Sequence, residues 1–204
     1  MALLLEEPTA TSEASIEAAR PEFYEVIHGD IVETPPMSDY ANGVSLRLTR
    51  AVDRHLVGHA VGEGFHEHLF QIPQPGDRTR NRRPDWAYVS YVRWPQDRPW
   101  PAQGHGMPVV PEIVAEVISP GDGAEDVLAK VREYLRGGVQ LVWVVYPLVR
   151  EVHAYVLESR TVKVYFAADE LEAGDILPGF RTPVAGLFPP IEQPPAGSVP
   201  PSSV

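Results

Sequence analysis

Apolar positions along the chain repeat with two periods, one typical of helices and one typical of strands. Between residues 40 and 59 apolar residues recur at every fourth position, which marks one face of a helix, and Gly58 suits its end. A second helical stripe covers 124–136, and the pair Gly137-Gly138 closes it. The predicted strands are 65–72, 86–92, 109–119 and 139–146. Two hairpins are also predicted, one over 23–33 and a terminal one formed by the strands 151–157 and 161–166.

The order of these elements indicates an α/β fold. The segment 139–146 is almost continuously apolar, which is typical of a strand buried on both faces. Strand, helix and strand over 109–146 form a candidate βαβ unit inside a mixed sheet. The ends differ in character, because 1–20 is rich in Ala, Glu, Ser and Thr and 189–204 has six prolines in sixteen residues. We therefore expect a flexible arm over 1–20, one folded domain over 21–188 and a disordered Pro-rich tail over 189–204.

Composition excludes several classes of protein. Zero cysteine excludes a disulfide scaffold, thiolate metal ligation and a cysteine nucleophile. No apolar run approaches the roughly 18 residues of a membrane-spanning helix. The start MALLLEEPTA lacks the basic residues and the long apolar core of a signal peptide. We therefore expect no membrane partner and a cytoplasmic location.

The net charge of −11 argues against a domain that attracts nucleic acid by its overall charge, because such domains are usually basic. Six of these negative charges lie in the flanking segments 1–20 and 158–204. Positive charge is concentrated in the polar segment 74–83, just before Pro84-Asp85. Such a run is either a solvated loop or a set of contacts to the phosphate backbone. Its four arginines are Arg78, Arg80, Arg82 and Arg83.

Two carboxylates and a lysine are the strongest candidates for chemistry. Asp85 begins a predicted strand, and Glu116 lies between Ala115 and Val117 in another. Burial of Glu116 is costly unless a metal ion, an arginine or Lys130 meets it. Two carboxylates can hold Mg²⁺ or Mn²⁺, which activates water for phosphodiester hydrolysis. A lysine can orient that water or stabilise the developing negative charge.

Several short segments, in this order and spacing, resemble the Uma-two family of restriction-endonuclease-like proteins, a branch of the PD-(D/E)XK nuclease superfamily. They are Tyr24–Asp30, Pro84-Asp85, Glu116–Pro120, Lys130, Tyr134, Gly138-Val139 and Trp143–Val145. The resemblance covers about 21–157 and implies a central mixed sheet flanked by helices, with an N-terminal hairpin. It also implies metal binding by Asp85 and Glu116, catalysis by Lys130, and a homodimer that cuts both strands of DNA.

Two positions need separate comment. In the superfamily pattern the lysine follows the acid by two residues, where this chain has Ile118. The Uma-two pattern places the lysine on the following helix, as Lys130 does. Glu25 matches the glutamate of the family's hairpin, and it either joins the metal ligands or is structural.

Histidine and tryptophan residues provide weaker candidates. His55 and His59 lack the glutamate of an HExxH zinc motif, so we expect structural or surface roles for them. Trp94 and Trp100 lie in the long segment 93–108, where they either pack or stack on bases.

The leading hypothesis is therefore an endonuclease that uses Mg²⁺ or Mn²⁺ to hydrolyse DNA phosphodiester bonds. One alternative is a non-catalytic nucleic-acid-binding or protein-interaction module on a nuclease scaffold, which Ile118 and the acidic net charge favour. Another is a metal hydrolase for a small phosphoester. The decisive structural question is whether Asp85, Glu116 and Lys130 converge within about 4–6 Å, where charges couple strongly.

Overall fold

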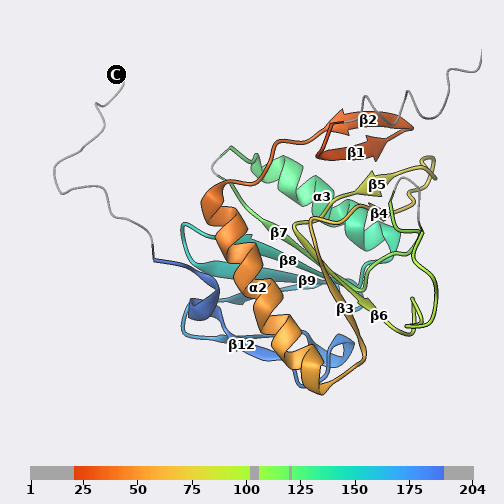
Figure 1. The fold of residues 1–204 in the computed structure, drawn as a ribbon. Coiled ribbons are helices and arrows are strands. Elements are labelled where there is room, and N and C mark those ends of the chain that lie inside the picture. Colours follow the sequence, from red (N-terminus) through yellow and green to blue (C-terminus); the bar gives the residue numbers. More distant parts are fainter. Residues whose placement is uncertain (1–20, 102–105, 120, 191–204) are drawn as a thin grey trace, which may run out of the picture.

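A six-stranded mixed sheet forms the centre of the molecule (Figure 1). The computed structural model describes residues 21–101, 106–119 and 121–190, so the predicted arm over 1–20 and residues 191–204 of the predicted tail lie outside it. The strand order is β10-β9-β8-β7-β6-β3, with β7 and β8 parallel and every other neighbouring pair antiparallel. The strands are β3 (Gly62–His66), β6 (Trp86–Ser90), β7 (Ile113–Val117), β8 (Leu141–Tyr146), β9 (Glu151–Val156) and β10 (Thr161–Tyr165).

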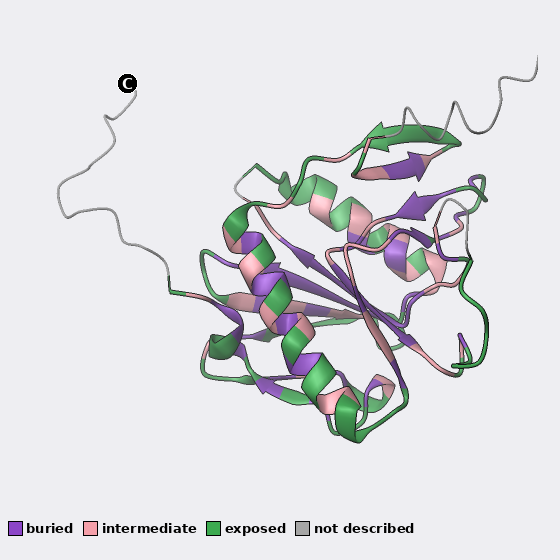
Figure 2. Cartoon of the chain, viewed as in Figure 1, coloured by how far each residue is buried: buried purple, intermediate pink, exposed green. Residues whose placement is uncertain are grey.

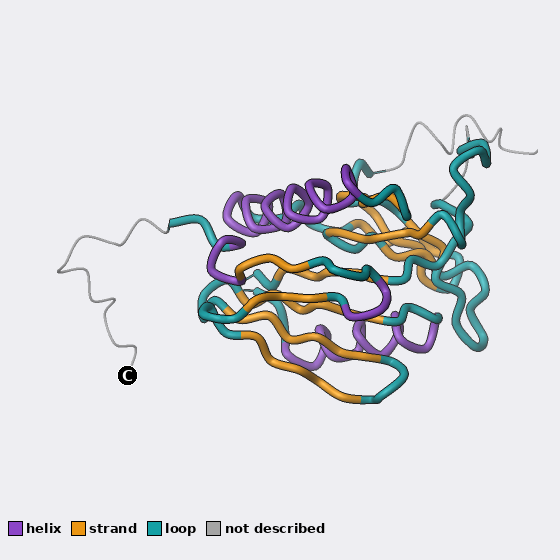
Figure 3. Tube along the Cα trace, turned by 90° about the horizontal axis from the view of Figure 1, so that it is seen from below, coloured by secondary structure: helices purple, strands orange, loops and turns teal. Residues whose placement is uncertain are grey.

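Two helices cover opposite faces of this sheet (Figure 3). Helix α2 (Asp39–Gly58) begins where the Ser38 side chain accepts a hydrogen bond from the Ala41 N–H, and its predicted apolar face is buried. Helix α3 (Ala124–Gly137) ends at Gly138, whose φ of 100° is the left-handed conformation that favours glycine. Because α3 connects the parallel strands β7 and β8, the predicted βαβ unit is confirmed. Neither helix, nor any other in the described part of the chain, has the length and apolarity to span a membrane.

Each face of the sheet has its own apolar core. Strands β7 and β8 are buried almost throughout, as the continuous apolar pattern predicts (Figure 2). Under α2, the fully buried rings of Trp86 and Trp143 stack with centroids 5.9 Å apart. A C-terminal segment without a predicted element completes this core. It contains β11 (Glu170–Glu172), the 3₁₀ turn η1 (Gly174–Ile176), β12 (Arg181–Pro183) and the 3₁₀ turn η2 (Val184–Leu187).

A small second sheet lies on the α3 side, in the order β2-β1-β5-β4. The predicted N-terminal hairpin is confirmed, but two other predictions are wrong. The run 65–72 is not one strand, because Glu67 takes the left-handed conformation (φ 44°) and turns the chain from one sheet to the other. The polar segment 74–83 is not only a loop, because its end pairs with both β1 and β4. The strands are β1 (Tyr24–Ile27), β2 (Asp30–Glu33), β4 (Phe70–Gln71) and β5 (Asn81–Arg82).

Candidate active site

The register of the large sheet places two acids opposite each other. Strands β6 and β7 are antiparallel, and Trp86 pairs with Ala115. Asp85 directly precedes Trp86 and Glu116 directly follows Ala115, so continuation of this register brings the two acids together, and the charge of Glu116 acts on Asp85. The Oδ2 atom of Asp85 also accepts a hydrogen bond of 2.5 Å from the Val117 N–H. The start of β6 and the end of β7 therefore hold the two predicted carboxylates together.

Lys130 reaches the same place from α3. Its Nζ atom lies 3.5 Å from Oε2 of Glu116. The Glu116 side chain is only 10% exposed, whereas that of Lys130 is 36% exposed. The lysine therefore connects a buried carboxylate with the solvent-facing side of the site. Lys130 and Glu116 are thus in direct contact, and the charges of both act on Asp85.

Tyr134 is a member of this group to which sequence reasoning gave no role. It lies one helical turn after Lys130 and is completely buried. Its hydroxyl donates a hydrogen bond of 2.5 Å to Oε1 of Glu116. Positions four apart share one helical face, so α3 holds both oxygens of the Glu116 carboxylate. The spacing of Lys130 and Tyr134 was visible in the sequence, but the carboxylate that joins them was not.

The site is electrostatically unfavourable for two bare carboxylates. Burial raises the pKa of Asp85 well above its usual range, and the charge of Glu116 raises it further. The hydrogen bond from the Val117 N–H and the charge of Lys130 lower this pKa, but by less. Burial also raises the pKa of Glu116, against the opposing effects of Lys130 and the Tyr134 hydroxyl. Glu116 in turn raises the pKa of Lys130, which keeps that ammonium protonated at neutral pH. Such a pair of carboxylates favours an additional cation.

A buried ion-pair network surrounds these residues. Arg82 donates to Glu25 with one end of its guanidinium group, and its Nη2 lies 2.5 Å from Oε2 of Glu133 on α3. Arg80 also contacts Glu133, with Nη1 and Oε1 3.3 Å apart, and its Nε lies 2.8 Å from Oδ2 of Asp77. Both arginines are only 7% exposed. Glu133 therefore connects α3 to β5 and, through Arg82, to β1.

This network divides the four predicted phosphate-binding arginines into two groups. Arg80 and Arg82 are buried and their donors are engaged by carboxylates. Arg78 is exposed. Arg83 is half-buried and donates to the main-chain carbonyls of Glu67 (2.6 Å) and Tyr24 (3.4 Å). Within the described residues no carboxylate forms an ion pair with Arg78 or Arg83, so these two retain positive charge for a ligand.

A small pocket of about 60 Å³ lies beside the converging residues. Lys130 and Glu116 line it, together with Ile118, which occupies the position of the superfamily lysine. The aliphatic Ile118 side chain leaves Lys130 as the cation of this pocket. The remaining lining residues are Val117, Asp122, Asp126 and Val127.

The donor set fits a hard divalent cation. In the described part of the chain no cluster of three or more His, Asp or Glu side chains is arranged to hold a metal ion. Zinc sites usually need three or four protein ligands, commonly His or Cys, and the described residues form no such group. Mg²⁺ is usually bound by one or two carboxylates, with water and substrate phosphates completing its coordination. Asp85 and Glu116 match this requirement.

Comparisons with known proteins agree with this architecture. Residues 13–185 match the model of the Uma2 (Uma-two) family, described as "Putative restriction endonuclease". A similar solved structure is the 1.96 Å crystal structure of "a putative nuclease belonging to DUF820" from Anabaena variabilis. It has a TM-score of 0.68 and 17% sequence identity, and the match covers 85% of this chain and 94% of that one. At this identity the likeness shows a shared fold. No curated protein matches the sequence.

The position of Glu133 predicts the effect of its neutralisation. Glu133→Gln leaves Arg80 and Arg82 without the charge of their common partner, and loss of a buried partner costs roughly 1–3 kcal/mol. Urea unfolding should show a loss of stability of this size. Glu125→Gln, in the exposed first turn of the same helix, is the control and should change stability by less than about 0.5 kcal/mol. Equal effects of the two variants would contradict the network.

Asp77 gives the network a predicted pH dependence. Burial alone raises the pKa of Asp77, but the His28 N–H, Thr79 and Arg80 together lower it below its usual value. A carboxyl group with a lowered folded-state pKa stabilises the protein above its unfolded pKa, near 3.9, and this contribution is lost as the pH falls further. The stability difference between wild type and Asp77→Asn should therefore shrink as the pH falls below about 4. Urea unfolding between pH 3 and 7 measures it, and a difference independent of pH would refute the assignment.

Proposed function

Because the chain belongs to the Uma2 ("Putative restriction endonuclease") family, we propose that it is a divalent-metal-dependent endonuclease that hydrolyses phosphodiester bonds of DNA. The observation that carries the proposal is the convergence of Asp85, Glu116 and Lys130 at the end of β7. Asp85 and Glu116 bind Mg²⁺ or Mn²⁺ in this proposal, and Lys130 is the catalytic lysine.

The chain's own residues prepare the site for the cation. Tyr134 fixes one oxygen of Glu116, and the Val117 N–H fixes one oxygen of Asp85. Oδ1 of Asp85 and Oε2 of Glu116 are the oxygens that these two hydrogen bonds do not use. When bound, Mg²⁺ or Mn²⁺ supplies Lewis acidity that polarises the phosphate and lowers the pKa of the attacking water.

Lys130 has a position suited to the hydrolytic step. Its ammonium is protonated, partly exposed and directed to the pocket beside Glu116. It orients the attacking water or stabilises negative charge that develops on the phosphate as water adds to phosphorus and a P–O bond breaks. Lys130 belongs to helix α3 and not to strand β7, and it lines the same pocket as Ile118, whose side chain is apolar.

Glu25 belongs, in this proposal, to the structural network and not to the metal ligands. Arg82 engages its Oε2, and the Arg83 N–H lies 3.4 Å from its Oε1. The buried Arg82 binds Glu25 by a direct hydrogen bond, so the charge of Glu25 is already compensated inside the protein. Glu25 nevertheless lies close enough to raise the pKa of Glu116, after the larger effect of burial, so its position supports the negative potential of the site.

Arg78 and Arg83 are the proposed contacts to the phosphate backbone, since Arg80 and Arg82 serve the buried network. Positive charge beside the scissile bond offsets part of the repulsion that a chain with net charge −11 exerts on DNA. We further propose a homodimer acting in the cytoplasm, because cleavage of both strands needs two sites related by a twofold axis.

Cleavage assays with the two lysines of the chain test this function. Wild-type protein should cleave plasmid DNA with Mg²⁺ or Mn²⁺ and lose activity with a chelator. Asp85→Asn, Glu116→Gln and Lys130→Ala should each lower the rate by at least about 100-fold, the usual effect of losing an acid–base or electrostatic group. Lys163→Ala is the matched control, because Lys163 is the other lysine and pairs with Glu172 on the surface. Circular dichroism checks that each variant folds.

Other outcomes identify the alternatives. If folded wild-type protein cleaves neither DNA nor RNA with any divalent metal, the endonuclease proposal is wrong and the non-catalytic module replaces it. If the protein hydrolyses bis(p-nitrophenyl) phosphate but not DNA, and does not bind DNA, the substrate is a small phosphoester. Full activity of Lys130→Ala would remove the lysine from the mechanism.

A further inference from the structure

An aromatic cluster beside the candidate active site ends in one exposed indole ring. The Phe65 and Trp100 ring centroids lie 5.3 Å apart at 36°, and His68 meets the Trp100 ring edge-on at 6.1 Å. Phe65 is 7% exposed, whereas Trp100 is 50% exposed. The other three tryptophans, Trp86, Trp94 and Trp143, are buried. Trp100 is therefore an aromatic surface held from behind by two rings and open to solvent.

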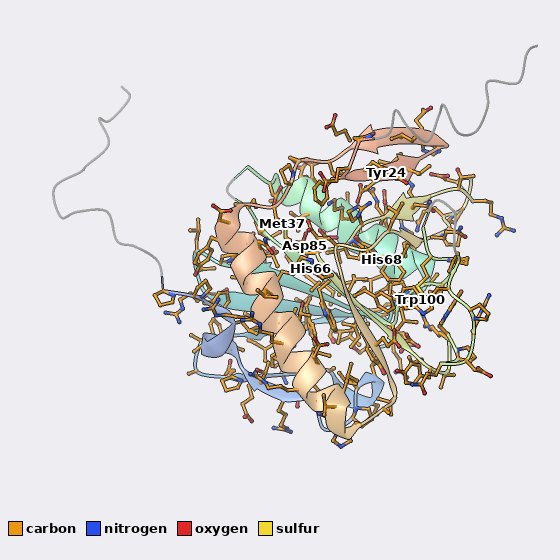
Figure 4. The ribbon with its side chains drawn as sticks, in the orientation of Figure 1. Tyr24, Met37, His66, His68, Asp85 and Trp100 are labelled. Carbon is orange, nitrogen blue, oxygen red and sulfur yellow. The ribbon has the colours of Figure 1, made fainter. Side chains whose placement is uncertain are left out.

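The turn that carries this cluster also contacts the active-site strand. His68 follows Glu67, whose N–H donates to the main-chain carbonyl of Asp85 at 3.2 Å and whose own carbonyl accepts from Arg83. In Figure 4, His68 lies between Asp85 and Trp100. The turn that carries His68 is thus hydrogen-bonded to the main chain of Asp85.

Arg83 adds positive charge near this aromatic cluster. Its guanidinium carbon lies 5.7 Å from the ring centroid of Phe23 and 5.7 Å from that of Tyr24, and it donates to carbonyls only. Its charge reaches the aromatic cluster, because it lowers the pKa of His68, after the larger effect of burial. The cluster therefore combines an exposed ring with the charge of an arginine that has no carboxylate partner among the described residues, which suits a ligand with both an aromatic ring and an anionic group better than an apolar peptide.

Nucleic acid strands combine aromatic bases with anionic phosphates. Bases stack on exposed aromatic side chains regardless of sequence, and arginine binds the phosphates between them. A base within a duplex has both faces covered by its neighbours, so only an unpaired, terminal or extruded base can present a face to Trp100.

We propose that Trp100, supported by Phe65 and His68, stacks on an unpaired base of the substrate strand, with an adjacent phosphate against Arg83. This inference rests on the proposed nuclease function and specifies its substrate: a strand with an unpaired base near the scissile phosphodiester. The stacked base fixes the position of the strand relative to Asp85 and Glu116.

Tryptophan fluorescence tests the inference directly, because only Trp100 of the four tryptophans is substantially exposed. The experiment titrates a 12-nucleotide single-stranded DNA with Mg²⁺ into Lys130→Ala protein, which keeps both carboxylates and prevents cleavage in this proposal. We expect quenching of the emission, and weaker binding to a blunt duplex of the same sequence. Trp100→Ala in the same background should weaken binding of the single strand about 5- to 150-fold, the usual range for one stacked base, by an anisotropy measurement.

Two controls separate stacking from a general surface effect. Trp100→Phe keeps a ring and should restore most of the affinity. Phe166→Ala removes another exposed aromatic ring, 56% exposed and located after β10, and should leave affinity unchanged. A set of single strands, each with an abasic site at a different position, identifies the stacked base. An abasic site at that position should weaken binding by proteins that contain Trp100 and should not change binding by Trp100→Ala.

The outcomes distinguish this inference from the proposed function. Unchanged affinity in Trp100→Ala, or no binding by any protein, overturns the stacking proposal. If wild-type protein cleaves plasmid and Trp100→Ala binds the single strand with unchanged affinity, the endonuclease proposal stands and the stacking proposal is wrong. If binding depends on Trp100 but wild-type protein cleaves no DNA with any divalent metal, the endonuclease proposal is wrong and the stacking proposal stands.

Discussion

The burial of the Glu116 carboxylate is the constraint on which the site depends. Glu116 stands in a strand covered on both faces, where an unpaired charge is strongly unfavourable. The protein compensates with the Tyr134 hydroxyl and the Lys130 ammonium, both from α3, but it also places Asp85 opposite. The compensation is therefore incomplete, and a divalent cation would complete it.

The ion pairs around this centre explain how an acidic chain uses its few basic residues. Arg80 and Arg82 lie on or next to a strand of only two residues, yet they join β5, β1 and α3 through Asp77, Glu25 and Glu133. They hold the small sheet against the helix that supplies Lys130. The four arginines that look equivalent in sequence therefore differ in the structure, because Arg80 and Arg82 are buried in ion pairs and Arg78 is exposed.

The position of Lys130 is compatible with the catalytic role proposed for it. In a βαβ unit the helix packs back over the strand it follows, so a side chain on its inner face reaches the strand's end. Lys130 and Ile118 both line the pocket beside Glu116, although they belong to different elements. The ammonium can therefore come from either one while the carboxylates stay in place.

The sequence by itself determined both helices, the βαβ unit and the two hairpins, because local periodicity shows which face of an element is buried. It also proposed Asp85, Glu116 and Lys130 as a candidate set, from their residue types and from the resemblance to the family. Strands of two or three residues, such as β4, β5, β11 and β12, have too few positions to show a period. Only the tertiary structure decided that Arg80 and Arg82 are buried, that Tyr134 holds Glu116, and that Trp100 is exposed beside the site. These features depend on partners up to 57 residues away along the chain, and a one-dimensional pattern does not specify which distant group a side chain meets.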